Sequence, residues 1–407
     1  MDSYIKLDNL QKHIDIVGAG PSGLFAAYLL LKKGYQINLY DHSSGPGKKF
    51  LVAGNGGLNL THSNPPEVFS EKYTEHATLF SSLLDEFSPQ GLRSFCSELG
   101  VETFIGSSGR VFPKELNAAK MLRNWITLLR DFEGFNLILN HRLIKIQTKN
   151  DALAIHFQDL KNQRNIEIRS QSTILALGGG SWKKTGSDGT WVSMIRSLGI
   201  EVAEFKAYNC GYNVDWSEIF QKKVDYSYLK NIAIDGVKGE VMITPYGIEG
   251  SLIYANSKSI QKDLSNKGIA AVNIDLRPLT KSEELLNKLK KVRAKDSRKN
   301  QLRKCLRIKD TEYMLLMELL SKEELNDDII LVEKIKNLTI NLKSARPIDE
   351  AISTRGGVEI SELTDHFESK KIKGLYFSGE MLNWDAPTGG YLLQGCFCLS
   401  RKVSENF

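Results

Sequence analysis

The feature that most constrains this chain is the run Gly18-Ala19-Gly20-Pro21-Ser22-Gly23, which follows a short apolar segment at residues 14–17. Helix-forming residues continue from Leu24 to Lys33 and stop at Gly34, and residues 36–40 are apolar again. This order predicts a strand, a glycine-rich turn, a helix and a second strand, which together make a βαβ unit. We therefore expect an α/β fold that opens with a parallel sheet.

Each glycine of this turn has a separate role in the dinucleotide-binding pattern. Gly18 permits the tight turn, Gly20 lets the backbone approach a diphosphate, and Gly23 allows the helix to pack closely on the strand. Asp41 follows the second strand, 23 positions after Gly18, where a carboxylate can accept hydrogen bonds from a ribose diol. The pattern predicts a dinucleotide with free ribose hydroxyls, which is either FAD or NAD.

Glycine turns after two later strands favour the longer cofactor. The segments Ala176-Leu177-Gly178 and Gly379-Glu380 each follow a short apolar run, and both should lie at the carboxyl edge of the sheet. The segment Thr388-Gly389-Gly390-Tyr391 then opens the last helix, where backbone N–H groups can face the pyrimidine edge of a flavin. The alternative is that Thr388 only caps this helix.

A chain of 407 residues exceeds the usual size of one hydrophobic core. We expect an FAD-binding domain in two parts, residues 1–190 and 346–407, of the Rossmann-like, glutathione-reductase type. Between them the pattern predicts an inserted lobe with a β-rich domain at 191–275 and a helical domain at 276–345. A second GxGxxG in a βαβ context is missing, so we expect no separate nicotinamide-binding domain.

Several classes of protein are disfavoured. The apolar runs are too short to span a membrane and the first twelve residues do not form a signal peptide, so we expect a cytoplasmic protein. The seven histidines and five cysteines have no metal-binding spacing, so we expect no metal. Cys396 and Cys398 lie two apart in an expected helix, which disfavours a disulfide between them.

Basic residues concentrate in one segment. Residues 281–310 hold twelve Lys or Arg against four Asp or Glu, a surplus that exceeds the net charge of +6 of the whole chain. The spacing of the leucines predicts amphipathic helix. This segment is either a solvated helix face or a docking surface for phosphate-bearing ligands such as nucleic acid.

A few isolated polar residues are weaker candidates. Lys48 and Lys49 could offset the charge of a diphosphate, or be solvated. Arg110 could hold an anionic substrate or pin its own loop. His62, in the expected site loop, fits a structural role better than a catalytic one.

Beyond these motifs, the sequence resembles the BaiN-like, also called YhiN-like, group of NAD(P)/FAD-dependent oxidoreductases. Six blocks carry the resemblance, in the order found in that family: IVGAGPSGLFAA, GKKFLVAGNGGLNLTHS, GRVFP, LALGGGSWKKTGSDG, STRGGVEISEL and GLYFSGEMLNWDAPTGGYLLQ. Many relatives have Arg-Cys-Asn where this chain has Gly57-Leu58-Asn59, so no thiol is expected beside the flavin at this point. Asp41 also stands where Glu is usual.

The resemblance implies a bound FAD, and an inserted lobe that is β-barrel-like in its first part and helical in its second. It places Leu143 near the adenine, and it places residues 54–59 and 388–391 around the isoalloxazine. The expected cofactor-binding residues are Gly18, Ala19, Gly20, Pro21, Ser22, Gly23, Asp41, His42, Lys49, Gly54, Asn55, Gly57, Asn59, Leu143, Ala176, Leu177, Gly178, Gly379, Glu380, Thr388, Gly389, Gly390 and Tyr391.

We therefore expect an FAD-dependent oxidoreductase that passes hydride from NAD(P)H, as a transient reductant, through FAD to a small-molecule acceptor. Asn55, Asn59 and Tyr391 are the candidates for a catalytic role, chosen by position. Two alternatives remain: a flavoprotein that binds or modifies nucleic acid through its basic helices, and a non-catalytic flavin sensor or scaffold. No membrane partner is expected, and the sequence predicts no oligomeric state.

Overall fold

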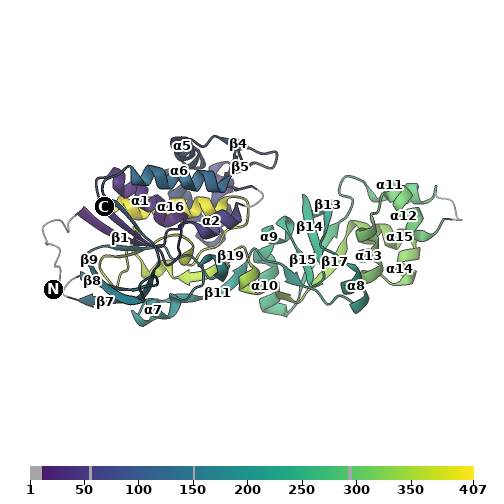
Figure 1. Cartoon of the computed structure of the whole chain (residues 1–407). Helices are drawn as coiled ribbons and strands as arrows, with labels where there is room; N and C mark the ends of the chain where they lie inside the picture. Colours follow the sequence, from purple (N-terminus) through teal and green to yellow (C-terminus); the bar gives the residue numbers. More distant parts are fainter. Residues whose placement is uncertain (1–11, 55–56, 150–151, 292–295) are drawn as a thin grey trace. The chain divides into compact units, whose positions relative to one another are not determined.

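The computed structural model describes residues 12–54, 57–149, 152–291 and 296–407 of the chain. The chain forms two compact units (Figure 1). The first unit contains the described residues up to Lys206 together with Ile352–Phe407, and the second is Ala207–Ala351. Residues 191–206, which the sequence-based division assigns to the insert, belong to the first unit, and residues 346–351, which it assigns to the FAD-binding domain, belong to the second.

A five-stranded parallel sheet is the centre of the first unit. Its order is β20-β10-β1-β2-β6, and the strands are β1 His13–Val17, β2 Gln36–Tyr40, β6 Phe135–Ile138, β10 Thr173–Leu175 and β20 Leu375–Phe377. Val17 pairs with Tyr40 and Leu175, and Leu175 pairs with Phe377, so four strands end in register. Their carboxyl ends therefore form one edge, as the glycine pattern predicts. The expected α/β fold is confirmed.

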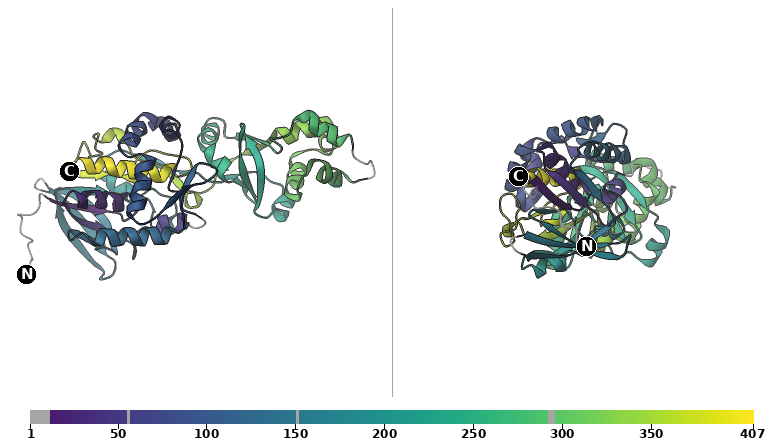
Figure 2. Two further views of the ribbon diagram at one scale, coloured as in Figure 1. Left: turned by 90° about the horizontal axis from the view of Figure 1, so that it is seen from above. Right: turned by 60° about the vertical axis from the view of Figure 1, so that its left-hand side comes forward.

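Helices α1 Pro21–Lys32 and α16 Tyr391–Glu405 pack against each other although they lie at opposite ends of the chain. Figure 2 shows α16, in yellow, beside the purple α1. Phe25 of α1 and Phe397 of α16 are fully buried, with ring centroids 4.8 Å apart. Phe95 and Trp125 extend this aromatic cluster. Each such ring contributes about 1.5–3 kcal/mol by burial, so the cluster holds the two ends of the chain together.

The remaining elements of the first unit surround the sheet. Two three-stranded antiparallel sheets have the orders β3-β5-β4 and β7-β8-β9, and a two-stranded sheet joins β11 and β19. The bounds are α2 Lys48–Ala53, β3 Thr61–His62, α3 Pro66–Ser70, η2 Glu71–His76, α4 Ala77–Glu86, α5 Pro89–Glu98, β4 Thr103–Ile105, β5 Arg110–Pro113, α6 Ala118–Arg130, β7 His141–Lys149, β8 Ala152–Asp159, β9 Arg164–Ser170, η3 Lys183–Thr185, α7 Val192–Ser197, β11 Val202–Tyr208, β19 Ser353–Val358, η5 Ile360–Glu362 and η6 Gly379–Met381.

The second unit has a seven-stranded antiparallel sheet, with the order β17-β16-β13-β14-β15-β12-β18, and a set of helices. One hydrophobic cluster includes residues from both the strands and the helices, so the two inserted domains expected from the sequence share a core. The bounds are β12 Tyr212–Asn213, α8 Glu218–Lys223, β13 Ser227–Ile234, β14 Val237–Thr244, β15 Gly247–Glu249, α9 Ser251–Ala255, α10 Ser257–Lys267, β16 Ala270–Asp275, α11 Ser282–Leu289, α12 Arg298–Leu306, α13 Asp310–Leu319, α14 Lys322–Asn326, α15 Asp328–Lys336, β17 Leu338–Leu342, β18 Ser344–Ala345 and η4 Ile348–Glu350.

Across the described ranges, none of the helices has the length and apolar character that crossing a membrane requires.

Candidate functional site

The three glycines of the first turn meet very different surroundings. A Cβ on Gly18, at φ +109°, would lie 2.2 Å from the carbonyl oxygen of Ala176. A Cβ on Gly23 would lie 1.9 Å from the carbonyl oxygen of Gly18. At Gly20 no atom lies within 4 Å of such a Cβ. Gly18 and Gly23 are therefore required by packing, whereas Gly20 keeps a space open at the N-terminus of α1.

Asp41 holds this turn in place. Its carboxylate accepts hydrogen bonds from the backbone N–H of Ala19, at 2.8 Å, and of Ser43, at 2.7 Å. His42 Nδ1 lies 3.8 Å from the same carboxylate. Each carboxylate oxygen keeps further acceptor capacity, so Asp41 can fix the turn and still accept from a ribose.

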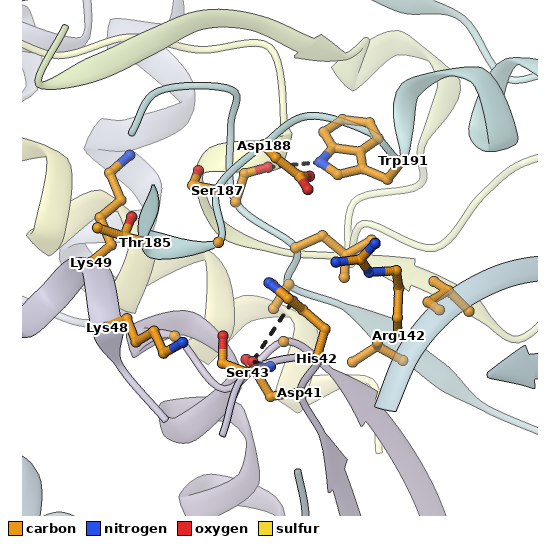
Figure 3. A pocket seen from close by; sticks show the side chains of 18 of the residues that line it. Asp41, His42, Ser43, Lys48, Lys49, Arg142, Thr185, Ser187, Asp188 and Trp191 are labelled. Atoms are coloured by element: carbon orange, nitrogen blue, oxygen red, sulfur yellow. Dashed lines mark hydrogen bonds and ion pairs between the residues drawn. The ribbon is translucent and has the colours of Figure 1, made fainter. Parts of the chain in front are cut away.

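A pocket of about 260 Å³ lies over the carboxyl edge of the sheet. Figure 3 shows Asp41, His42 and Ser43 on one side of it and Ser187, Asp188 and Trp191 on the other. Twelve of the residues expected from the sequence line it: Gly18, Gly20, Pro21, Ser22, Asp41, His42, Lys49, Leu143, Ala176, Leu177, Gly178 and Glu380. The first turn and the later strand ends thus contribute to one site.

The sequence interpretation missed two parts of the pocket wall. One is the start of β7, where His141, Arg142 and Ile144 flank Leu143. The other is the segment from Thr185 to Met194. Closely spaced glycines at 186 and 189 signal a turn there, but sequence alone does not reveal what that turn contacts.

Hydrogen bonds fix the second of these parts against the strand-end turn. Trp191 Nε1 donates to the carbonyl oxygen of Gly178 at 3.0 Å, and Ser187 Oγ donates to that of Gly179 at 3.0 Å. A Cβ on Gly186 would lie 2.7 Å from the ring of His42. The segment therefore closes over the residues that follow β2, which explains why it belongs to the first unit.

Lys49 and Glu380 join two walls of the pocket. Lys49 Nζ lies 2.7 Å from Glu380 Oε2 and 2.8 Å from Ser181 Oγ. The Glu380 side chain is 9% exposed, and its other oxygen accepts from the backbone N–H of Thr354. The charge of Lys49 is thus balanced by a carboxylate of the protein, so Lys49 links α2 to η6. Lys48 is exposed at the rim of the pocket.

The two ends of the chain meet beside the pocket. A Cβ on Gly379 would lie 2.3 Å from Ser22 Oγ, and Ser400 Oγ donates to the carbonyl oxygen of Ser22 at 3.0 Å. Cys396 of α16 lines the pocket, and burial raises its pKa to about 12. This thiol is therefore protonated and unreactive at neutral pH. Cys396 and Cys398 are free, as the helical spacing predicts.

The residues expected around an isoalloxazine form a separate group, outside the lining of this pocket. In the amide orientation that satisfies its neighbours, Asn59 donates to the carbonyl oxygen of Thr61 and accepts from the N–H of Gly390. A Cβ on Gly390 would lie 2.5 Å from Thr61 Cα. The N–H of Gly390, expected to face a flavin, is therefore used within the protein. Thr388 does not cap α16, because the N-cap position is Gly390.

Tyr391 is held from three sides. Its hydroxyl accepts from Asn64 Nδ2 at 2.9 Å, and its carbonyl oxygen accepts from the hydroxyl of Tyr73 at 2.8 Å. Its ring stacks on that of His62, with centroids 5.2 Å apart. Burial raises the pKa of Tyr391 to about 12. Of the other two catalytic candidates, Asn59 is committed to the backbone contacts above, and Asn55 lies outside the described residues.

His62 has a structural part in this group. Its Nδ1 accepts from the backbone N–H of Asn64 at 3.1 Å, and its Nε2 lies 3.0 Å from the carbonyl oxygen of Ser108. Burial, with the positive charge of Arg110, lowers its pKa. A neutral His62 that donates through Nε2 satisfies both contacts. In the described ranges no three His, Cys, Asp or Glu residues are grouped to hold a metal.

These residues fit FAD. The space at Gly20 admits a diphosphate at the N-terminus of α1, whose first N–H groups and positive dipole end suit an anion. Asp41 lines the same pocket and has acceptor capacity for a ribose hydroxyl, and the lining from α16 and η6 extends the site toward the C-terminal part of the chain. Fold and pocket together define the class of protein, an FAD-binding Rossmann-like protein.

Comparison with known proteins gives the family. The chain belongs to the HI0933-like family, whose model, described as "HI0933-like protein Rossmann domain", matches residues 12–406. This confirms the resemblance seen in the sequence blocks. The chain is 25% identical to a 3-dehydro-bile acid delta(4,6)-reductase of Clostridium scindens, over 94% of this chain and 95% of that protein. It is 24% identical to a ribosomal RNA dihydrouridine synthase of Haemophilus influenzae, over 93% and 94%.

Solved structures support the fold. A flavocytochrome c3 fumarate reductase in its open conformation matches with a TM-score of 0.54 and 16% identity, covering 97% of this chain and 78% of that one. A 3-ketosteroid-delta4-(5alpha)-dehydrogenase of Rhodococcus jostii matches with a TM-score of 0.52 and 14% identity, covering 98% of each.

Proposed function

We propose that this protein passes a hydride from NAD(P)H, by way of bound FAD, to a carbon–carbon double bond conjugated with a carbonyl group in a small-molecule acceptor. The observation that carries the proposal is the pocket, in which the open space at Gly20 and the carboxylate of Asp41 lie together with residues from the C-terminal part of the chain. When bound, FAD supplies the hydride chemistry.

The residues of the chain have the following proposed roles. The N–H groups at the start of α1 bind the diphosphate, Asp41 accepts from the adenosine ribose, and Leu143 contacts the adenine. The Lys49–Glu380 pair keeps α2 and η6 at a fixed separation along the cofactor. The group around Asn59 and residues 388–391 lies toward the isoalloxazine.

Tyr391 is the proposed proton donor. Asn64 occupies a lone pair of its hydroxyl oxygen, which leaves the O–H to donate to an acceptor. Its high pKa keeps this proton in place at neutral pH. Asn59 serves instead to position Gly390, since both ends of its amide are used in contacts with the backbone.

The class of acceptor is inferred from the relatives. A delta(4,6)-reductase of a 3-dehydro-bile acid and a dihydrouridine synthase both reduce a ring double bond that is conjugated with a carbonyl group. The two relatives share this chemistry, although their substrates differ greatly in size. A conjugated enone is therefore the acceptor that both relatives support.

An anaerobic stopped-flow experiment on the flavin-loaded protein tests the proposal. We expect NADH or NADPH to bleach the flavin, and the bleached protein to be reoxidised by a 3-keto-4-ene steroid such as 4-androstene-3,17-dione or by uridine. Bleaching by neither nucleotide, with slow reduction that no acceptor changes, would instead support the flavin sensor or scaffold. A colourless protein that takes up no added FAD would refute the proposal entirely.

Nucleic acid is the second candidate acceptor, and the basic helices of the second unit favour it. Lys290, Lys291 and Arg303, near or within α11 and α12, are exposed. Ion pairs neutralise some neighbouring charges: Lys299 lies 2.6 Å from Asp310, and Lys304 lies 2.9 Å from Asp296. The remaining positive charges suit phosphate groups.

RNA binding is tested by the salt dependence of affinity for a uridine-rich RNA oligonucleotide. If RNA is the acceptor, log affinity falls linearly with log salt, with a slope of about −0.7 for each phosphate contacted. Reversing the charges of Lys290 and Lys291 to Glu should reduce this slope by about 1 or more. Lys222→Glu, at an exposed position on α8, is the matched control. No salt-dependent binding leaves the small-molecule acceptor as the sole proposal.

A further inference from the structure

One arginine beside Tyr391 has no partner in the part of the chain that the structure describes. Arg110 begins β5 and is half-buried, and within the described ranges its guanidinium has no hydrogen-bond or ion-pair partner. Other partly buried arginines of the chain are paired. Arg277 makes two contacts with Glu312, and Arg346 lies 2.8 Å from Glu350. A guanidinium has five N–H donors, so an unpaired one beside a candidate site has capacity for a ligand.

The surroundings of Arg110 are built by the same residues that hold Tyr391. A Cβ on Gly389 would lie 3.0 Å from the ring of Tyr391 and 3.9 Å from Arg110 Nε. Gly389, which has no side chain, therefore lies between these two side chains. A Cβ on Gly109 would lie 2.5 Å from the ring of His62. Gly389 thus lets the start of α16 approach Arg110, and Gly109 lets the loop before β5 approach His62 of β3.

The alternative role proposed for Arg110 from the sequence was to pin its own loop, and the contacts of the described residues do not show this role. Its loop is held by backbone hydrogen bonds, from Gly106 N to the carbonyl oxygen of Arg110 and from Ser63 N to that of Gly109. His62 adds the contact with Ser108 described above. None of these contacts uses the guanidinium.

We propose that Arg110 binds the carbonyl oxygen of the acceptor and stabilises the negative charge that this oxygen gains during reduction. This inference rests on the proposed reductase function. A hydride adds to the carbon β to the carbonyl, the electron pair of the double bond moves to the oxygen, and the enolate then takes a proton from Tyr391 at the α carbon. The positive charge of the guanidinium stabilises the negative oxygen, and this lowers the activation barrier of the reduction. Solvent reprotonates Tyr391, and NAD(P)H supplies the next hydride.

The geometry also restricts which ligands suit this site. Arg110 is the partner for an oxygen that carries negative charge or develops it. Its charge acts on the Tyr391 hydroxyl and on His62 by lowering the pKa of each, and Lys72 is a second cation that lowers the pKa of His62. An acceptor with a carbonyl or phenolate oxygen fits this charge pattern, whereas a cationic ligand does not.

The test uses 4-nitrophenol as a probe on the flavin-loaded protein, because its two protonation states differ in colour. The wild-type protein should bind the phenolate and lower the apparent pKa of the bound probe. Arg110→Gln should bind the phenolate about tenfold or more weakly, and Arg110→Lys should recover part of the loss, since it keeps the charge without the planar fork. Lys72→Gln is the matched control, because it removes a nearby positive charge but retains the guanidinium.

Half-reactions separate this inference from the proposed function. Arg110→Gln should leave flavin reduction by NAD(P)H unchanged and slow the reoxidation by 4-androstene-3,17-dione about 100-fold or more. Equal phenolate binding by wild type and Arg110→Gln, or an equal loss in Lys72→Gln, would overturn the role of Arg110 while the flavin chemistry stands. Circular dichroism and flavin content confirm that each variant is folded and loaded. Failure to bind FAD in the wild type refutes the proposed function instead.

Discussion

At the scale of single residues, the turn from Gly18 to Gly23 contains glycines that packing requires and a glycine that leaves space for a ligand. Gly18 and Gly23 face backbone atoms at distances that exclude a side chain, whereas Gly20 faces open space. The sequence motif already assigns separate roles to the three positions. The surroundings agree with it, because the two glycines expected to shape the turn and pack the helix are crowded and the one expected to face the diphosphate is not.

Substitution by alanine should separate these two roles. Gly20→Ala places a methyl group in the space proposed for the diphosphate, at a φ of −78° that alanine tolerates. We expect an unchanged free energy of unfolding without ligand and an FAD affinity about tenfold or more weaker, which is about 1.4 kcal/mol. Gly23→Ala should lower the free energy of unfolding by about 3 kcal/mol or more. Urea titration and flavin fluorescence measure the two effects. Unaltered FAD binding by Gly20→Ala would place the diphosphate elsewhere.

The hydroxyl of Tyr391 gives a second prediction at this scale. Tyr391→Phe should slow reoxidation by the acceptor about 100-fold and leave flavin reduction by NAD(P)H intact, because it removes the proton donor and, besides that, only the hydrogen bond from Asn64. The donor is the neutral phenol, so its contribution is lost as pH rises through a pKa of about 12. The wild-type rate of reoxidation should show no loss from this group between about pH 6 and about pH 10. Tyr254→Phe in the second unit is the control, and an unimpaired Tyr391→Phe would exclude this donor.

At the scale of elements, the site is assembled by contacts between segments far apart in the chain. The Lys49–Glu380 pair joins α2 to η6, and Trp191 joins the segment before α7 to the turn after β10. Each contact brings one pocket wall to a strand end. The sheet fixes the strand ends, and these contacts fix the loops that cover them.

The Lys49–Glu380 pair predicts a coupling between these elements. Glu380→Gln leaves the Lys49 ammonium without its counter-ion, and should lower the free energy of unfolding by about 1–3 kcal/mol, less than for a fully buried pair because Lys49 is 23% exposed. The double variant Lys49→Gln/Glu380→Gln should recover part of this loss. A double-mutant cycle by urea titration measures the coupling. Strictly additive losses would show that the pair does not link α2 to η6.

At the scale of the whole molecule, the chain has two hydrophobic cores. One belongs to the first unit and includes residues of the parallel sheet with α1 and α16, and the other belongs to the second unit. The candidate pocket is lined by residues of the first unit alone. Cofactor binding should therefore stabilise one core directly.

Calorimetry tests this division. We expect two unfolding transitions, and saturating FAD should raise the midpoint of only one of them, by the equivalent of about 2.7 kcal/mol at a ligand concentration of 100 Kd. Gly20→Ala should abolish most of this shift at the same FAD concentration. A single transition that moves as a whole would mean that the two cores unfold together.

The sequence by itself determined the βαβ unit, the α/β class and the location of the first turn, because strand–turn–helix signals are local and glycine geometry is a property of a few adjacent residues. It also indicated that late glycine turns belong with the first. Local pattern did not reveal that Gly390 packs on Thr61 and that Asn59 takes its N–H, since both contacts join distant segments.

Only the tertiary structure decided which residues complete the pocket wall, where the second unit begins, and that Arg110 has no partner among the described residues while Lys49 has one. The physical reason is that these properties depend on distances between segments separated by many residues. Hydrophobic burial brings those segments together, and it leaves no signature at the polar positions that meet as a result.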